Sequence, residues 1–396
     1  MLLRLFLVVI PILLAQSAQS ATVLVVRLHN TSAYPDLDWV GESVAETLRS
    51  EFNQAGQIVL DHEVSAEGMN RLALRSDALF TKATLIRLGR SLDADYVVYG
   101  TYEVKLTPGS SQLKDSSVTV TAQFIDLKKL KDGTGISETG KLVDLSRLEE
   151  HLAWESLKYL QPGVDISLDK FLAPQKLTRL DAEESYVRGL LSTSLEQQQK
   201  WFLQAANLDQ RFIAPAYELG KLYQRRKEYR LCLRWLARVP ADDGRYANAR
   251  FQMGLCAYDL ADYNSAGNYF RQVVKIIPLN EVYNNLGASE DQLNQPVALD
   301  DYRRALAGDP NDPVYQFNLG AALLRANSFD EAAKHLRSAS GRLPDDYEIE
   351  GLLQRANVRQ PYPPNTKPLA PARLKPNLDV TAFRQLKAVL QPKGDQ

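Results

Sequence analysis

Glycine recurs at a nearly constant interval along the second half of this chain. Gly220, Gly254, Gly287 and Gly320 are 34, 33 and 33 residues apart, and a looser copy of the pattern begins at Gly189, 31 residues before the first of them. Two antiparallel helices can approach closely only where small side chains face each other at the crossing. The interval therefore predicts a series of helix pairs that share one packing scheme.

The other repeat positions support the same helix pair. Gly254 is followed twelve residues later by Ala266 and four residues after that by Phe270, and the Gly287 copy has both positions one residue early. Proline closes the last three copies because it lacks the backbone N–H that a continuing helix needs. The repeat positions are Gly220, Gly254, Ala266, Phe270, Pro278, Gly287, Ala298, Tyr302, Pro310, Gly320, Ala332, Leu336 and Pro344.

These residues resemble a known repeat family. The stretch VYQFNLGAALLRANSFDEAAKHLRSASGRLPDD, residues 314–346, is similar to a tetratricopeptide repeat over nearly its whole length. A period near 34 residues with helix, turn, helix and a final proline is the signature of that repeat. Because a single helix pair leaves an apolar face open, we expect about five stacked pairs and a capping helix within residues 183–356.

The resemblance also implies a binding surface. In tetratricopeptide proteins the first helices line a concave groove, which the side chains three before, four after and five after each glycine face. Aromatic rings that alternate with amides and charges are typical of a surface that binds a peptide. The alternative for each residue is that it packs against the next helix. The predicted groove residues are Tyr217, Gln224, Arg225, Phe251, Tyr258, Asp259, Asn284, Asp291, Gln292, Phe317, Leu324 and Arg325.

One ligand class is not expected in this groove. Relatives that clamp the C-terminal carboxylate of a peptide use a set of lysines and asparagines, and Lys221 stands here without the matching partners. The expected partner is therefore a protein or peptide held in another way.

The first half of the chain has no such period. Alternating and apolar runs predict strands, and amphipathic runs predict helices. We expect strands at 21–28, 57–61, 94–106, 116–127 and 135–143, and helices at 39–56, 84–92 and 145–160. This order predicts a mixed sheet with flanking helices at residues 21–162. The fold class is thus an α/β N-terminal domain followed by an all-α tetratricopeptide solenoid.

The N-terminal region resembles a second family. Asn-x-Ser at Asn30, Trp-x-Gly-Glu at Trp39 and Ala-Asp-Tyr-Val-x-x-Gly at Ala94 look like motifs of the TolB amino-terminal-like domain, which is related to the curli-export protein CsgG. The similarity covers about Val23 to Leu160. It implies a non-catalytic assembly domain, and because relatives differ in function, it is a firmer guide to fold than to activity.

The ends of the chain predict export and a proline-rich tail. Residues 1–20 hold an arginine, a short apolar run and small residues before Ala21, which is typical of a cleaved secretory signal. The run is shorter than the roughly 20 apolar residues that span a bilayer, so we expect no integral membrane segment after cleavage and a periplasmic location. Residues 163–182 are expected to be a linker, and residues 357–396 an extended, mobile tail with one short helix.

Two cysteines allow one covalent link. An exported protein can form a disulfide between Cys232 and Cys256, which fall on neighbouring helices of adjacent pairs. Each position also suits a small buried side chain, so both interpretations stay open.

The residues of catalytic or metal-binding type do not form a site in the sequence. The net charge of −1 favours neither nucleic acid nor an anionic membrane. The histidines lack zinc spacing, and an Asp-His-Glu run at Asp61 is expected to be an exposed strand end. Ser111 and Lys114 match a serine-lysine pattern but fall in a loop, and Asp132 begins a predicted hairpin turn. We expect no catalytic residue, no metal and no cofactor. The histidines are His29, His62, His151 and His335.

Three functions follow from these features. The first is an exported, non-enzymatic adapter that binds a protein or peptide in the groove. The second is a component of a cell-envelope export or outer-membrane assembly complex. The third is a hydrolase with its site in the N-terminal domain, which would need Ser, His or carboxylate side chains to converge in a pocket there.

Overall fold

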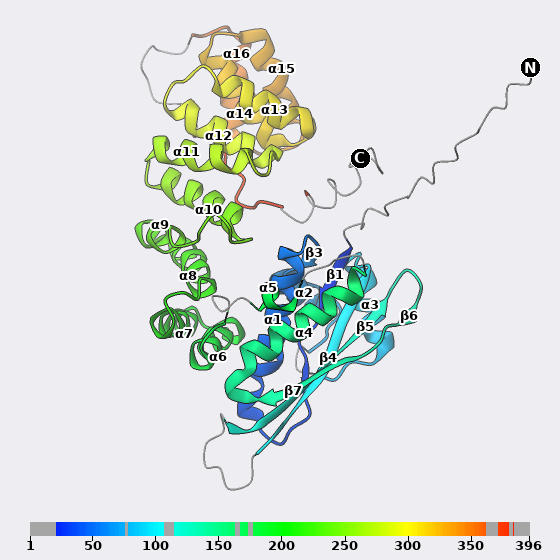
Figure 1. Cartoon of the computed structure of the whole chain (residues 1–396). Coiled ribbons are helices and arrows are strands. Elements are labelled where there is room, and N and C mark those ends of the chain that lie inside the picture. Colours follow the sequence, from blue (N-terminus) through cyan, green and yellow to red (C-terminus); the bar gives the residue numbers. More distant parts are fainter. Residues whose placement is uncertain are drawn as a thin grey trace, which may run out of the picture.

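A computed structural model describes residues 21–75, 78–106, 115–162, 167–172, 177–361, 371–379 and 383. The chain begins with a mixed sheet flanked by helices and continues as an arc of helix pairs (Figure 1). The first pair of the arc lies beside the sheet domain, and the last helices lie farthest from it. The predicted fold class is confirmed.

The sheet has the order β3-β1-β4-β5-β6, with β2 also paired to β4 and β7 also paired to β5. Strand β1 runs parallel to β3 and β4, whereas the long hairpin of β4 and β5 is antiparallel and pairs Tyr96 with Asp126 and Lys105 with Ser117. The strands are β1 (Thr22–Val25), β2 (His29–Asn30), β3 (Ile58–Leu60), β4 (Tyr96–Lys105), β5 (Ser117–Asp126), β6 (Lys131–Asp132) and β7 (Ile136–Lys141).

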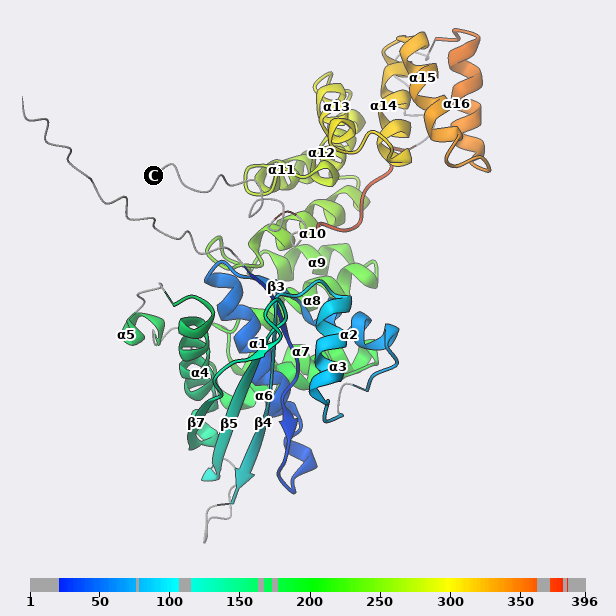
Figure 2. The same ribbon diagram turned by 90° about the vertical axis from the view of Figure 1, so that its right-hand side faces the viewer.

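Helices cover both faces of this sheet. Because successive strand residues point to opposite faces, Val23 and Val25 pack in the cluster that contains α1 (Trp39–Gln54) and α4 (Leu145–Leu160). Leu24 of β1 packs instead in the cluster of α2 (His62–Arg71) and α3 (Lys82–Ser91). The two helix layers lie on opposite sides of the sheet (Figure 2).

The Asp-His-Glu run departs from its prediction. The strand ends at Leu60, and Asp61 is the N-cap of α2, where its side chain accepts a hydrogen bond from the backbone N–H of Val64. Aspartate is a preferred N-cap because its carboxylate satisfies a free N–H of the first helical turn. His62 therefore lies on a helix, not at an exposed strand end.

The solenoid consists of helices that pair in sequence order. The bounds are α6 (Leu180–Leu191), α7 (Leu195–Leu208), α8 (Ala214–Arg225), α9 (Tyr229–Leu236), α10 (Tyr246–Asp259), α11 (Tyr263–Val274), α12 (Asn280–Gln292), α13 (Ala298–Gly308), α14 (Pro313–Arg325), α15 (Phe329–Ser340) and α16 (Tyr347–Asn357), after the short α5 (Leu168–Phe171). Their first helices are thus α6, α8, α10, α12 and α14, and α16 follows the last pair.

The glycine period has the expected steric cause. A Cβ added to Gly254 would lie 2.5 Å from the Phe270 ring, and one added to Gly320 would lie 2.8 Å from Leu336. The glycine thus makes room for the large side chain of the second helix. The turns between the helices repeat as well: in four of the five pairs the turn holds one residue at positive φ, seven positions after the glycine. These residues are Lys227, Ala261, Asn294 and Asn327.

The first helix pair is packed onto the sheet domain. Ser43 of α1 donates a hydrogen bond to Glu183 of α6 at 2.6 Å, and Lys221 of α8 pairs with Glu63 of α2 at 2.9 Å. One apolar cluster runs from the sheet through α1 and α6 to α10. The N-terminal domain and the first pairs therefore share a core.

A disulfide joins two neighbouring pairs. Cys232 of α9 and Cys256 of α10 are bonded, with their Cα atoms 6.7 Å apart, and both residues are fully buried. The structure thus supports the disulfide over two separate buried thiols.

Several predicted features lie outside the described residues. The secretory signal, Ser111 and Lys114 lie outside the described residues, as does most of the predicted C-terminal helix. No helix in the described parts of the chain is both long and apolar enough to span a membrane.

Candidate functional site

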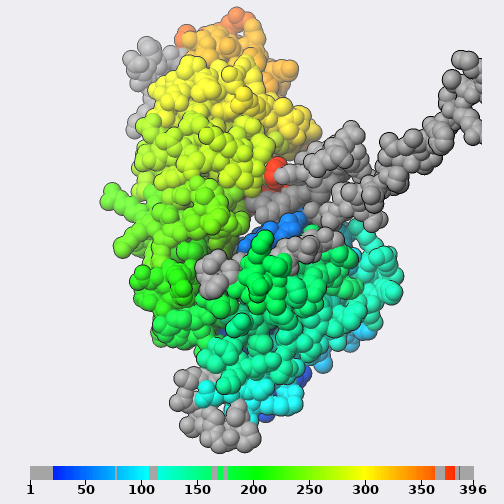
Figure 3. Space-filling view, in the orientation of Figure 1, coloured from blue at the N-terminus to red at the C-terminus, as the bar shows by residue number. Residues whose placement is uncertain are grey.

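A segment of the chain's own tail lies across the first helices of the later repeats. Residues 371–379, with the sequence PARLKPNLD, run from α16 past α14 to α12 (Figure 2). In the space-filling view, part of the described tail is visible as a small red patch at the edge of the helical arc that faces the N-terminal domain (Figure 3). This segment was expected to be extended and mobile. It is extended, but hydrogen bonds fix its backbone.

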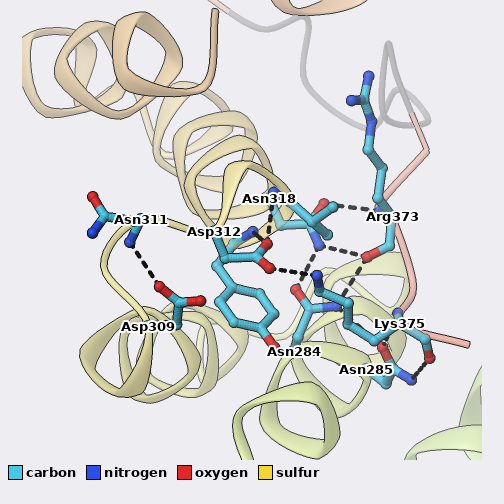
Figure 4. A network of polar contacts seen from close by, with 10 residues as sticks. Asn284, Asn285, Asp309, Asn311, Asp312, Asn318, Arg373 and Lys375 are labelled. Atoms are coloured by element: carbon cyan, nitrogen blue, oxygen red, sulfur yellow. Dashed lines mark hydrogen bonds and ion pairs between the residues drawn. The ribbon is translucent and has the colours of Figure 1, made fainter. Parts of the chain in front are cut away.

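Two asparagines hold that backbone (Figure 4). Asn318 of α14 donates to the carbonyl oxygen of Arg373 at 2.8 Å and accepts from its N–H at 2.8 Å. Asn285 of α12 does the same for Lys375, with both distances 2.8 Å. A carboxamide has a donor and an acceptor side by side, so each asparagine binds both polar groups of one peptide residue.

A third asparagine connects the two clamps. Asn284 donates to the carbonyl of Arg373 at 2.9 Å and accepts from Asn318 at 2.8 Å. Asn284, Asn285 and Asn318 are at most 1% exposed. With the tail in place, each of these buried amides has hydrogen-bond partners, as buried polar groups require.

The Arg373 side chain enters an aromatic and acidic pocket. Its guanidinium lies 3.8 Å from the centre of the Phe317 ring and forms ion pairs with Asp346 at 2.7 Å and with Glu348 at 3.0 Å. The hydrogen bond from Arg373 lowers the pKa of Asp346. Planar guanidinium groups favour this combination of ring stacking and carboxylate pairing.

Lys375 has a matching but smaller pocket. Its ammonium pairs with Asp312 at 2.5 Å and lies 4.9 Å from the centre of the Tyr315 ring. Asp312 is also the N-cap of α14, where it accepts from the backbone N–H groups of Val314 and Tyr315. The same carboxylate thus caps the helix and binds the tail.

Apolar side chains of the tail complete the contact. Leu374, between the two cations, packs against both apolar clusters of the later repeats. Leu378 and Phe383 pack against the cluster centred on α10 and α11. The tail therefore runs backward along the solenoid, from the last repeat toward the middle of the arc.

The predicted groove residues divide into distinct groups. Asn284 and Phe317, both three before a glycine, contact the tail. Phe251 and Leu324 are fully buried in the apolar clusters of the repeats, and the Phe251 ring packs at 5.6 Å against that of Phe270. Tail side chains pack against the cluster of Phe251 as well, so its place in the groove stays a prediction.

The side chains four and five residues after the repeat glycine mostly contact a neighbouring helix. Arg225 donates to Gln198 of the preceding pair at 3.2 Å, and Arg325 forms an ion pair with Asp291. The side chains of Tyr217 and Tyr258 contact Lys221 and Tyr263, respectively. Arg225, Tyr258 and Arg325 lie late in the first helix of their pair, and Tyr217 lies beside Lys221, which pairs with Glu63 of the N-terminal domain. Gln224, Asp259 and Gln292 belong to the same late positions.

Most of the tail contacts were not predicted. Asn285 and Asn318 lie two residues before Gly287 and Gly320, outside the positions predicted to face the groove. The available signal was an asparagine at the same repeat position in consecutive copies, on the face of a helix that is otherwise apolar. The other missed residues are Tyr315, Asp312, Asp346 and Glu348.

The N-terminal domain has a small hollow that bears on the hydrolase hypothesis. Its lining includes His29, Asn30, Ser32 and Asp38. The Ser32 hydroxyl donates to the Asn30 side chain, which in turn donates to Asp38 at 2.8 Å. Serine hydrolysis needs a base bonded to the nucleophile. Here the serine is bonded to an amide, so the hollow gives no support to the hydrolase hypothesis.

An acidic cluster nearby is an ion-pair network. The ligand-type atoms of Glu42, Glu46 and His62 lie within 4.8 Å of one another. Arg49 forms ion pairs with both carboxylates, at 2.7 Å for Glu42. Its positive charge and the hydrogen bond from His62 help lower the pKa of Glu42 to about 2, against the opposing effect of burial. The Arg49 guanidinium thus already supplies the positive charge that these two carboxylates attract.

A family model described as FlgO protein matches residues 11–132. No curated protein matches the chain. Among solved structures, the chain is similar to "YrrB: a TPR protein with an unusual peptide-binding site", at 18% identity over 45% of this chain and 92% of that one, with a TM-score of 0.39.

Two further solved structures are of MamA. One is 18% identical over 37% of this chain and 87% of that chain, with a TM-score of 0.33. The other, MamA from Desulfovibrio magneticus RS-1, is 20% identical over 43% and 93%, with a TM-score of 0.37. The assignment of the helical region to tetratricopeptide pairs rests on the chain's own glycine period and helix pairing. The TolB-like resemblance of the N-terminal domain stays a prediction.

Proposed function

We propose that this protein is an exported, non-enzymatic adapter that binds a protein or peptide partner in the groove formed by α12, α14 and α16. The observation that carries the proposal is the pair of asparagine clamps, which hold the N–H and C=O groups of Arg373 and Lys375. Backbone contacts give affinity for any extended peptide, and the pockets beside them give specificity.

Crosslinking and affinity capture test this proposal. The full chain is compared with the Asn285→Ala, Asn318→Ala double variant, and Asn268→Ala is the matched control because Asn268 is an exposed asparagine on α11, outside the groove. We expect the double variant alone to lose the captured partners. Capture of the same partners by all three proteins would refute the groove assignment.

A second candidate, membership in a cell-envelope assembly complex, is favoured by the resemblance of residues 23–160 to the CsgG-related domain. In that case the protein should co-purify with envelope fractions through its N-terminal domain. Partner capture would then be insensitive to Asn285→Ala and Asn318→Ala and sensitive to changes on the sheet domain. A freely soluble protein in the same fractionation would contradict this candidate.

A further inference from the structure

The groove and the tail segment are complementary in charge. Asp312, Asp346 and Glu348 face the segment from α14 and α16, and its two cations, Arg373 and Lys375, each pair with them. The pairs are partly buried, with the Arg373 and Lys375 side chains 22% and 25% exposed. Partly buried charge pairs between complementary surfaces mainly select the partner.

The spacing of the contacts defines a sequence pattern. In an extended chain, residues two apart present their backbone groups along the same edge, and the clamps bind residues 373 and 375. Leu374 between them enters an apolar contact. Pro376 follows the second clamp, and because proline favours the extended conformation of the residue before it, it prepares Lys375 for binding.

We propose that the groove recognises an extended Arg-apolar-Lys-Pro segment of a partner protein, and that residues 371–379 of this chain are a tethered competitor for the same site. This inference rests on the proposed function. The tail binds as a ligand would, through its backbone and through side-chain pockets. Residues 371–379 themselves form no helix or strand.

The competitor is suited to being displaced. The tail segment is bound by a few hydrogen bonds and partly exposed ion pairs. The entropy lost when the segment becomes ordered offsets part of the free energy that these contacts contribute. Only residues 362–370 separate it from the last described residue after α16. A short tether gives a local concentration near the millimolar range, so a peptide with a dissociation constant of about 10–100 µM should bind the free groove about ten- to a hundredfold more tightly than the occupied one.

A fluorescent peptide, PARLKPNLD, tests the proposal by its anisotropy on titration with full-length protein. The first protein is the wild type, and the second carries Arg373→Glu and Lys375→Glu, which should release the tail. The matched control carries Arg230→Glu and Arg234→Glu, the same change in charge at two exposed residues of α9. We expect the tail variant to bind the peptide about ten- to a hundredfold more tightly than the wild type, and the control to behave as the wild type.

Two further proteins separate recognition from competition. Adding Asn285→Ala and Asn318→Ala to the tail variant should weaken peptide binding at least about tenfold, and a peptide with both cations changed to glutamate should not bind. Circular dichroism of each variant checks that the helices are intact. Equal affinity of the wild type and the tail variant would overturn the competition, and absence of binding to the tail variant would overturn the proposed sequence pattern.

The result also distinguishes this inference from the proposed function. If the peptide fails to bind while partner capture still depends on Asn285 and Asn318, the adapter proposal stands and the ligand pattern is wrong. Light scattering on the same samples tests where the tail binds. A wild-type dimer that becomes monomeric with Arg373→Glu and Lys375→Glu would place the tail in a second copy and overturn its assignment as a tethered competitor.

Discussion

Reduction of the disulfide between Cys232 and Cys256 should destabilise the solenoid by an amount that the structure sets. The two cysteines are 24 residues apart, and loop-closure entropy for a loop of about this length gives roughly 3.5 kcal/mol. Both residues are fully buried, so the thiols should stay packed after reduction. We therefore expect most of the effect to arise in the unfolded chain.

Thermal unfolding followed by circular dichroism measures this effect. For a region of this size, each kcal/mol of stability shifts the melting temperature by roughly 2–4 °C. A non-thiol reductant should therefore lower the midpoint of the helical transition by about 7–14 °C. The Cys232→Ala, Cys256→Ala variant is the control and should not respond to the reductant. If reduction leaves the wild-type midpoint unchanged, or alkylation finds free thiols in the unreduced protein, the reasoning is wrong.

Two further predictions concern packing and protonation. Gly254→Ala should cost about 1–3 kcal/mol in urea unfolding, because its Cβ would lie 2.5 Å from the Phe270 ring, whereas Gly351→Ala, in α16 with nothing within 4 Å, should be neutral or stabilising; equal effects would contradict the steric role of the repeat glycine. Burial and the neighbouring Glu183 raise the pKa of Glu149, so the stability it contributes is full at low pH and is lost as the pH rises through its folded pKa. The melting temperature of Glu149→Gln relative to wild type should therefore rise from pH 5 to pH 8, and a constant difference would show that Glu149 is not protonated in the folded protein.

The repeat region could be predicted because its signals are local. Gly254 and Phe270 fall within one helix pair, and every further pair repeats the constraint. The sheet was predicted for the same reason, since β4 and β5 each have long runs of alternating side chains and pair as a hairpin. Among the described residues, the short β2 and β6, the helix after Asp61 and the short α5 within the predicted linker were not predicted. Asp61 is a typical helix N-cap and could have predicted the helix that follows it. It was instead assigned to the end of the preceding strand.

The binding site could be predicted only in part because its contacts are distant in sequence. Asn318 and Arg373 are 55 residues apart, and Asn285 and Lys375 are 90 apart. The tail is rich in proline and has no periodicity, so composition predicted an extended segment without a binding surface. The predicted groove ran along α8, α10, α12 and α14, and the tail is hydrogen-bonded to two of these helices and forms an ion pair with α16, which was expected only as a cap. The predicted side chains were taken from fixed offsets of the family. The tail is held by the predicted position three before the glycine (Asn284, Phe317) and by the position next to it (Asn285, Asn318), which was not predicted.

Amide hydrogen exchange along residues 371–379 of the full-length protein tests the central claim most directly. The N–H groups of Arg373 and Lys375 each donate to a buried asparagine. With the tethered affinity argued above, both should exchange about ten- to a hundredfold more slowly than in the free peptide, and Asn318→Ala should remove the protection at Arg373. Exchange of both amides at the rate of the free peptide would contradict a groove that binds extended backbone.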